Sequence, residues 1–98
     1  MLTSRQRSIL SSLASKECVV QTMGKYGPTE AFAAKLDELL SHHELVKVKF
    51  LDYKDEKREI AEKLAASTGA ELVRIIGNNA IFYRQNPDPE HRRIQLDA

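Results

Sequence analysis

The chain has 98 residues, 42% of them hydrophobic, which fits one domain with a single core. Lysine and arginine (15) nearly balance aspartate and glutamate (14), so the net charge of +1 would not attract a polyanion, and any basic surface must be local. The single cysteine excludes an internal disulfide and a cysteine-based zinc knuckle, and no apolar run has the length of a membrane span. The start lacks a hydrophobic signal core, so we expect a cytoplasmic protein.

A helix and a short strand are predicted for the first part of the chain. The helix extends to about residues 15–16, and Ile9, Leu10 and Leu13 recur at the spacing of one helix face. The segment Cys18–Met23 then has the composition of a strand. Because Cys18 precedes two valines and has no evident base partner, we expect a buried structural thiol rather than a nucleophile.

Two glycines surround a lysine and an aromatic residue directly before the second predicted helix. Gly24 and Gly27 allow the main chain to approach a ligand closely, Lys25 adds a mobile cation, and the helix start adds N–H groups and a positive dipole end. This combination predicts a phosphate-binding loop, in which Tyr26 could stack on a base or a ribose. A short glycine pair can also be a simple turn that joins a strand to a helix.

The second helix and the strand after it have clear periodicity. Pro28 suits the first turn of the helix, and apolar residues recur along it until His42 and His43. The strand Leu45–Phe50 alternates, so one face carries the apolar side chains and Lys47 and Lys49 lie on the other. The inward residues of this strand are Val46, Val48 and Phe50.

A third helix and a hairpin complete the predicted domain. Turn residues 52–55 precede a helix that ends near Thr68, with Gly69 as its C-terminal cap. Residues 71–76 and 80–84 are strand-like and are separated by a Gly-Asn-Asn turn, which predicts an antiparallel hairpin. In the first of these strands, the alternation predicts Val73 and Ile75 inward and Arg74 outward.

The order of elements is α-β-α-β-α-β-β, which predicts an α/β fold of two layers with a mixed four-stranded sheet. Two strand–helix–strand crossovers favour parallel neighbours, and the hairpin adds an antiparallel member. We expect residues 1–84 to form one domain. Residues 85–98 form a tail with two prolines, either loosely ordered or docked through Ile94 and Leu96.

The alternation of the strands predicts a basic sheet face. Lys47, Lys49 and Arg74 project from the face opposite the apolar side chains, Arg84 could extend this surface, and Lys25 lies at its rim. Such a face could bind the phosphates of a nucleic acid. The alternative is that outward lysines keep an exposed sheet soluble.

Neither a metal site nor a catalytic site is predicted. His42 and His43 are adjacent at a helix end and point in different directions, no third ligand follows at a suitable spacing, and the helix dipole explains their position. The acidic residues of the third helix alternate with lysine and arginine, which indicates surface ion pairs. We therefore expect no enzyme activity, no cofactor and no small-molecule substrate.

Three separated motifs between about residues 2 and 84 resemble the CRM domain, the YhbY-type family of RNA-binding proteins. They are Gly24–Glu30, His43–Lys49, and Ile76–Gly77 followed by Ile81–Arg84. The resemblance implies the fold of the C-terminal domain of translation initiation factor three and a GxxG loop like that of KH domains. Stand-alone bacterial members associate with precursors of the large ribosomal subunit, and this chain resembles that type. Pro28 and Asn78 depart from the family, where leucine and a basic residue are frequent.

The predicted function is therefore non-catalytic RNA binding, with rRNA of the large-subunit precursor as the partner implied by the resemblance. The alternative is a protein-interaction adaptor on the ribosome or on a translation factor, which would use Ile94 and Leu96. The predicted RNA-binding residues are Gly24, Lys25, Tyr26, Gly27, Thr29, Lys47, Lys49, Arg74 and Arg84.

Overall fold

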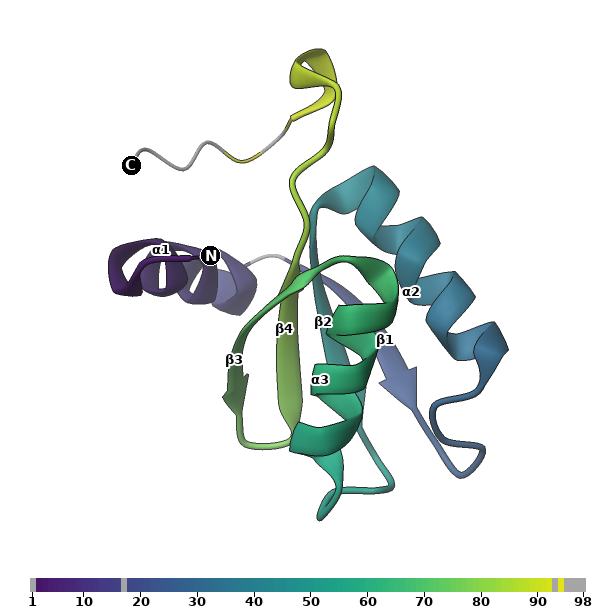
Figure 1. Cartoon of the computed structure of the whole chain (residues 1–98). Helices are drawn as coiled ribbons and strands as arrows, with labels where there is room; N and C mark the ends of the chain where they lie inside the picture. Colours follow the sequence, from purple (N-terminus) through teal and green to yellow (C-terminus); the bar gives the residue numbers. More distant parts are fainter. Residues whose placement is uncertain (1, 17, 93, 95–98) are drawn as a thin grey trace.

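The computed structural model describes residues 2–16, 18–92 and 94, and its elements follow the predicted order (Figure 1). The helices are α1 (Ser4–Lys16), α2 (Glu30–His43) and α3 (Lys57–Thr68), with a short 3₁₀ turn at Pro89–His91. The strands are β1 (Val19–Met23), β2 (Leu45–Phe50), β3 (Glu71–Ile76) and β4 (Asn79–Tyr83).

The four strands form one mixed sheet in the order β1-β2-β4-β3, which confirms the predicted fold class. β1 and β2 are parallel, and β4 is antiparallel to both β2 and β3. The prediction that β2 and β3 are neighbours was wrong, because β4 lies between them. Residues 80–83 of β4 are all buried, whereas Arg74 and Ile76 of β3 are exposed, so burial on both faces favours β4 at the centre.

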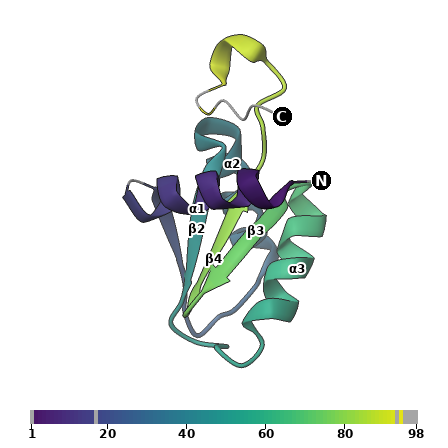
Figure 2. The same ribbon diagram turned by 90° about the vertical axis from the view of Figure 1, so that its left-hand side faces the viewer.

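The helices lie on both faces of the sheet. α2 and α3 cover one face and enclose the larger core, while α1 crosses one end of the opposite face (Figure 2). The larger core contains the predicted inward residues of β2 together with Met23, Leu36, Leu40, Ile60, Ala61, Leu64, Ala65, Ala80 and Phe82. The smaller core, under α1, consists of Leu10, Ala14, Leu45, Val73, Ile81 and Tyr83. The part of that face beyond α1 has no helix over it in the described part of the chain.

Two predicted side-chain orientations were wrong. In α1, Leu10 and Ala14 are buried but Leu13 is exposed, because the helix contacts the sheet along a narrow stripe. In β3, a bulge between Leu72 and Arg74 turns Val73 toward α1, away from the larger core that Ile75 contacts.

The tail is held by Glu44, a buried residue that follows α2. Its carboxylate accepts hydrogen bonds from the backbone N–H groups of Asn86 (2.7 Å) and Ile94 (3.0 Å). The side chain of Ile94 packs against the smaller core, and Leu96 lies outside the described residues. The tail is therefore attached to the domain as far as Ile94.

Candidate nucleic-acid interface

Residues 24–27 form a tight turn at the carboxyl end of β1. The N–H of Gly27 donates to the carbonyl oxygen of Gly24 over 3.1 Å, and Gly27 has φ +69°, a conformation that favours glycine. Lys25 and Tyr26 occupy the tip. The Tyr26 side chain is 80% exposed, and the Lys25 ammonium lies 5.2 Å from the centre of its ring. A cation and an aromatic plane are thus presented together to solvent.

The helix start beside this turn is capped by Thr29. Its hydroxyl oxygen accepts a hydrogen bond from the N–H of Phe32 over 3.1 Å, and α2 begins at Glu30. Pro28 therefore lies before the cap rather than in the first helical turn, which corrects the prediction. The N–H groups of Glu30 and Ala31, at the first two helical positions, have no intrahelical acceptor and can bind an anion.

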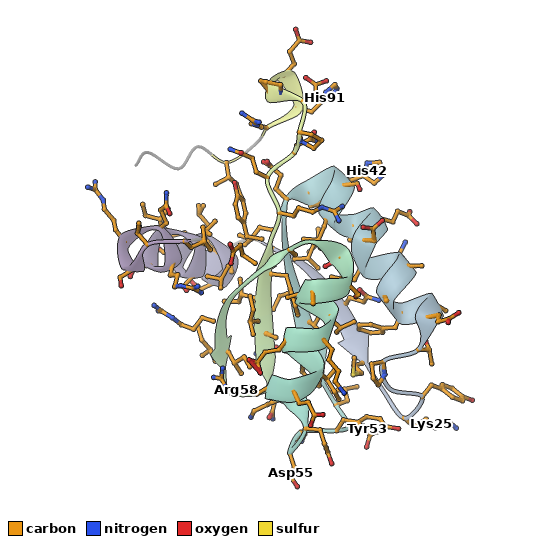
Figure 3. All side chains as sticks on the ribbon, in the orientation of Figure 1. Lys25, His42, Tyr53, Asp55, Arg58 and His91 are labelled. Carbon is orange, nitrogen blue, oxygen red and sulfur yellow. The ribbon has the colours of Figure 1, made fainter. Side chains whose placement is uncertain are left out.

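A second loop, residues 51–56 between β2 and α3, contacts the glycine turn through hydrogen bonds. The carbonyl oxygen of Met23 accepts hydrogen bonds from the N–H groups of Leu51 (3.0 Å) and Asp52 (3.4 Å). Tyr53 points toward the turn, and its hydroxyl donates to the carbonyl oxygen of Lys25 over 2.9 Å (Figure 3). The backbone of Tyr53 itself has φ +59°, in the left-handed region.

Tyr53 also limits which residue can stand at Gly27. A Cβ atom at position 27 would lie 3.0 Å from the Tyr53 ring, so the ring packs directly against the glycine. Tyr53 was not among the predicted site residues, because no periodicity relates a tyrosine in a turn to a lysine 28 residues earlier. The only available signal was that parallel strands β1 and β2 end side by side, which brings the loops after them together.

The sheet face that α1 partly covers carries two rows of side chains that cross all the strands, and of these side chains only Ile81, in the smaller core, is buried. The strand register places Val20, Lys47, Ile81 and Arg74 in one row and Thr22, Lys49, Asn79 and Ile76 in the next. Lys49 and Arg74 are exposed and Lys47 is half-buried. Val20 is 48% exposed and Ile76 is 50% exposed, so this surface carries exposed aliphatic groups as well as cations. We call these two rows the open face.

The glycine turn lies at the β1 edge of the open face. Thr22 pairs with Lys49 in the register and precedes Gly24 by two residues, so the second row borders the turn. Arg74 lies on the opposite edge strand, β3. Lys47, Lys49 and Arg74 thus share one face, as the alternation predicted, and Lys25 extends from the loop at its border.

Arg84 is separate from this group of residues. Its guanidinium donates to the Asp37 carboxylate (2.6 Å), the Thr68 carbonyl (2.7 Å), the Asp37 carbonyl (2.9 Å) and the Ser41 hydroxyl (2.8 Å). Asp37 and Ser41 belong to the second half of α2 and Thr68 is the last residue of α3, the two helices that cover the larger core. Arg84, which directly follows β4, therefore joins α2 to the end of α3.

The remaining candidates for chemistry have structural surroundings. The Cys18 thiol is half-buried and donates to the carbonyl oxygen of Leu45 over 3.6 Å, and burial raises the pKa of this thiol. His42 lies at the end of the molecule away from Lys25 and Tyr53, as does His91 (Figure 3). Within the described ranges, no group of three or more His, Cys, Asp or Glu side chains could hold a metal ion.

The acidic tail residue Asp88 forms a local turn. The N–H of Glu90 and the ring of His91 hydrogen-bond to its carboxylate and hold the pKa of Asp88 below its usual value. These contacts shape the 3₁₀ turn and involve no residue of the open face. Separately, no helix in the described part of the chain is both long and apolar enough to cross a membrane.

Comparisons with known proteins agree with this architecture. The model of the CRS1/YhbY (CRM) domain family matches residues 2–84. A Pseudomonas aeruginosa relative named "Probable RNA-binding protein PA4753" is 36% identical over 90% of this chain and 86% of its own length. The Bacillus subtilis protein named "Probable RNA-binding protein YqeI" is 31% identical over 98% of this chain and 99% of its own length.

A solved structure gives the same fold. The solution structure of the Staphylococcus aureus protein SAV1595 has a TM-score of 0.78 and 34% sequence identity, over 97% of this chain and 100% of that one. The names of these relatives are those of RNA-binding proteins and not of enzymes.

Proposed function

Because the chain belongs to the CRS1/YhbY (CRM) family, we propose that it is a non-catalytic RNA-binding protein whose interface comprises the glycine turn and the open face. The observation that carries the proposal is the juxtaposition at residues 24–31 of a cation, an exposed aromatic ring and a helix start. The relatives of this chain are named RNA-binding proteins. The cation, the ring and the helix start supply the phosphate contacts and the stacking surface that RNA binding uses.

The glycine turn would bind the RNA backbone at one phosphate. Gly24 would let a phosphate approach the main chain, Gly27 would form the turn against Tyr53, and the N–H groups of Glu30 and Ala31 would donate to the phosphate. Lys25 would neutralise its charge, while Tyr26 would stack on the neighbouring base or ribose. Thr29 would act indirectly, because its hydroxyl oxygen holds the helix start in place.

The open face would bind the flanking nucleotides. Lys47 and Lys49 lie on β2 and Arg74 lies on β3, with β4 between these strands. Because neighbouring strands are about 4.8 Å apart, the cations are spaced widely enough to neutralise different phosphates. The aliphatic groups of Val20 and Ile76, on the two edge strands beside these cations, can pack against riboses. Arg84 is not included in this surface, because its guanidinium is bonded to Asp37, Ser41 and Thr68.

We further propose that the RNA is rRNA of a large-subunit precursor and that the protein acts in ribosome assembly in the cytoplasm. The support is the resemblance to stand-alone bacterial members of the family. Crosslinking in cells, followed by sequencing of the attached RNA, would test it. Recovery of messenger RNA instead of rRNA would contradict this assignment and leave RNA binding intact.

Replacing Lys25 with alanine tests the interface itself. The variant should bind a single-stranded RNA more weakly, and the slope of log K against log salt should decrease by about 0.7, the value for one lost phosphate contact. Lys35→Ala is the matched control, because Lys35 is an exposed lysine of α2 that faces Glu38 at 3.6 Å. Equal salt slopes for the parent chain and Lys25→Ala would remove the turn from the interface.

A further inference from the structure

A groove runs between the beginning of α2 and α3, on the face of the sheet opposite the open face. Its volume is about 570 Å³, in the range of pockets that hold a ligand. The apolar side chains of Ala33, Ile60 and Leu64 line it, together with Tyr53. The larger core lies beneath, since Ile60 and Leu64 belong to it. This surface is therefore apolar, concave and built on two packed helices.

The rim of this groove is acidic. Glu30, Glu56 and Glu59 line it, and all three are exposed. The single lysine of the lining, Lys63, lies 3.1 Å from the carboxylate of Glu59 and is therefore paired. With three carboxylates against one ammonium group, the side chains of the rim carry a net negative charge that attracts cations. The groove thus differs in charge from the open face, which carries lysines and an arginine.

We propose that this groove binds a basic amphipathic segment of a partner protein. Apolar side chains of the segment would pack on Ala33, Ile60 and Leu64, and its lysines or arginines would pair with the carboxylates of the rim. This is the recognition mode in which an amphipathic helix lies in an apolar groove. The proposal rests on charge complementarity and on the apolar lining, and it does not depend on RNA binding at the open face.

Tyr53 connects the groove with the glycine turn. Its ring lines the groove, and its hydroxyl donates to the carbonyl oxygen of Lys25. A segment bound in the groove would therefore contact the residue that supports the turn. One chain could hold RNA on one side and a basic protein segment on the other, with Tyr53 between them.

The proposal can be tested with a synthetic amphipathic peptide in which leucines recur every three or four residues, as on one face of a helix, and lysines occupy the other face. Added to the full-length chain, it should shift the NMR signals of Ile60, Leu64 and Ser67, which line the groove from α3 and lie outside the proposed phosphate site at residues 24–31. A peptide with glutamate in place of every lysine should not. An oligouridylate should leave these signals in place. Absence of groove shifts with the lysine peptide, or larger groove shifts with oligouridylate, would overturn the proposal.

Charge reversal at the rim gives the second test. Glu56→Lys combined with Glu59→Lys should weaken peptide binding about tenfold, because each attractive surface pair becomes repulsive. Glu62→Lys is the matched control, since Glu62 is exposed on α3 but lines a different groove beside Arg58. The control should change the affinity less than about twofold. If each added lysine weakens peptide binding equally at the rim and at position 62, the effect depends only on net charge, and the proposed site is refuted.

A milder pair, Glu56→Gln with Glu59→Gln, provides the same comparison if charge reversal disturbs folding. It should also weaken peptide binding, and by less than the lysine pair. In each variant, oligouridylate binding is measured in parallel and should be retained. Loss of peptide binding with retained RNA binding supports the groove, whereas a parent chain that binds oligouridylate but not the peptide refutes the groove and leaves the proposed RNA interface standing.

Discussion

The hydroxyl of Tyr53 donates a 2.9 Å hydrogen bond to the carbonyl oxygen of Lys25, and the two residues belong to loops that follow neighbouring parallel strands. The same tyrosine ring lies against Gly27, where a Cβ atom would be only 3.0 Å away. The tip of the turn is exposed, but its backbone is held by Tyr53. A preorganised turn loses less conformational entropy when it binds a ligand.

The two glycines of the turn should tolerate substitution differently. Gly27→Ala combines a left-handed backbone (φ +69°) with the close contact to Tyr53, so it should lower the free energy of unfolding by about 1–2 kcal/mol or displace the ring. Gly24→Ala is the matched control, because its Cβ would meet nothing within 4 Å. It should change stability by less than about 0.5 kcal/mol. Urea unfolding measures both, and equal losses would contradict the role assigned to Gly27.

Tyr53→Phe should loosen the glycine turn without disturbing the core. The change removes only the hydroxyl that donates to Lys25, so stability should fall by about 0.5–1 kcal/mol, and amide hydrogen exchange at residues 25–27 should accelerate. Tyr26→Phe removes a hydroxyl from a ring that is 80% exposed and should change neither quantity. If exchange in the turn is the same in Tyr53→Phe as in the parent chain, the hydrogen bond does not restrain the turn.

The helices and strands could be predicted because their periodicity is set by burial on one side. In β2, Val46, Val48 and Phe50 alternate with Lys47 and Lys49, so both the strand and its two faces follow from spacing alone. In β3, four apolar residues surround a single arginine, so alternation cannot locate a bulge, and Val73 was assigned to the wrong face. A bulge depends on backbone geometry that the spacing of side chains does not encode.

The candidate site was predictable only where it depends on one strand or one turn. Lys47 and Lys49 share a face because they belong to one strand, and residues 24–27 are contiguous. By contrast, the contact of Tyr53 with the turn and the bonds of Arg84 to α2 and α3 depend on tertiary packing. An arginine at a strand end looks the same in the sequence whether it binds a phosphate or caps a helix.

Replacement of Arg84 distinguishes these two roles. Arg84→Met should lower the free energy of unfolding by about 1–3 kcal/mol, because the Thr68 carbonyl and the Asp37 carboxylate lose the guanidinium as donor. Arg84→Lys should recover little of this loss, since an ammonium cannot reproduce the planar fork that reaches four acceptors.

The RNA-binding salt slope completes the comparison at Arg84. Under conditions in which each variant is folded, the slope of log K for RNA against log salt should be the same in both variants as in the parent chain. The reason is that the guanidinium is bonded within the protein. If Arg84→Lys keeps the slope of the parent chain and Arg84→Met has a smaller one, Arg84 contacts RNA after all.

Alkaline pH should weaken the smaller core. Burial raises the pKa of the Cys18 thiol above its ordinary 9.0, and burial together with the Glu44 carboxylate raises the pKa of the Tyr83 hydroxyl above its ordinary 10.0. Both groups then keep their protons longer in the folded chain than in the unfolded one. Their contribution to stability is complete below pH 9.0 and is lost as the pH rises through the raised values.

The double variant Cys18→Ala, Tyr83→Phe isolates this effect. Lysines also titrate at alkaline pH, so the informative quantity is the difference between the parent chain and the variant, measured by urea unfolding from about pH 7 to pH 11. The parent should lose more stability than the variant above about pH 9, and Tyr26→Phe should follow the parent because that ring is exposed. Parallel curves for the parent and the double variant would show that neither group carries a raised pKa into the folded state.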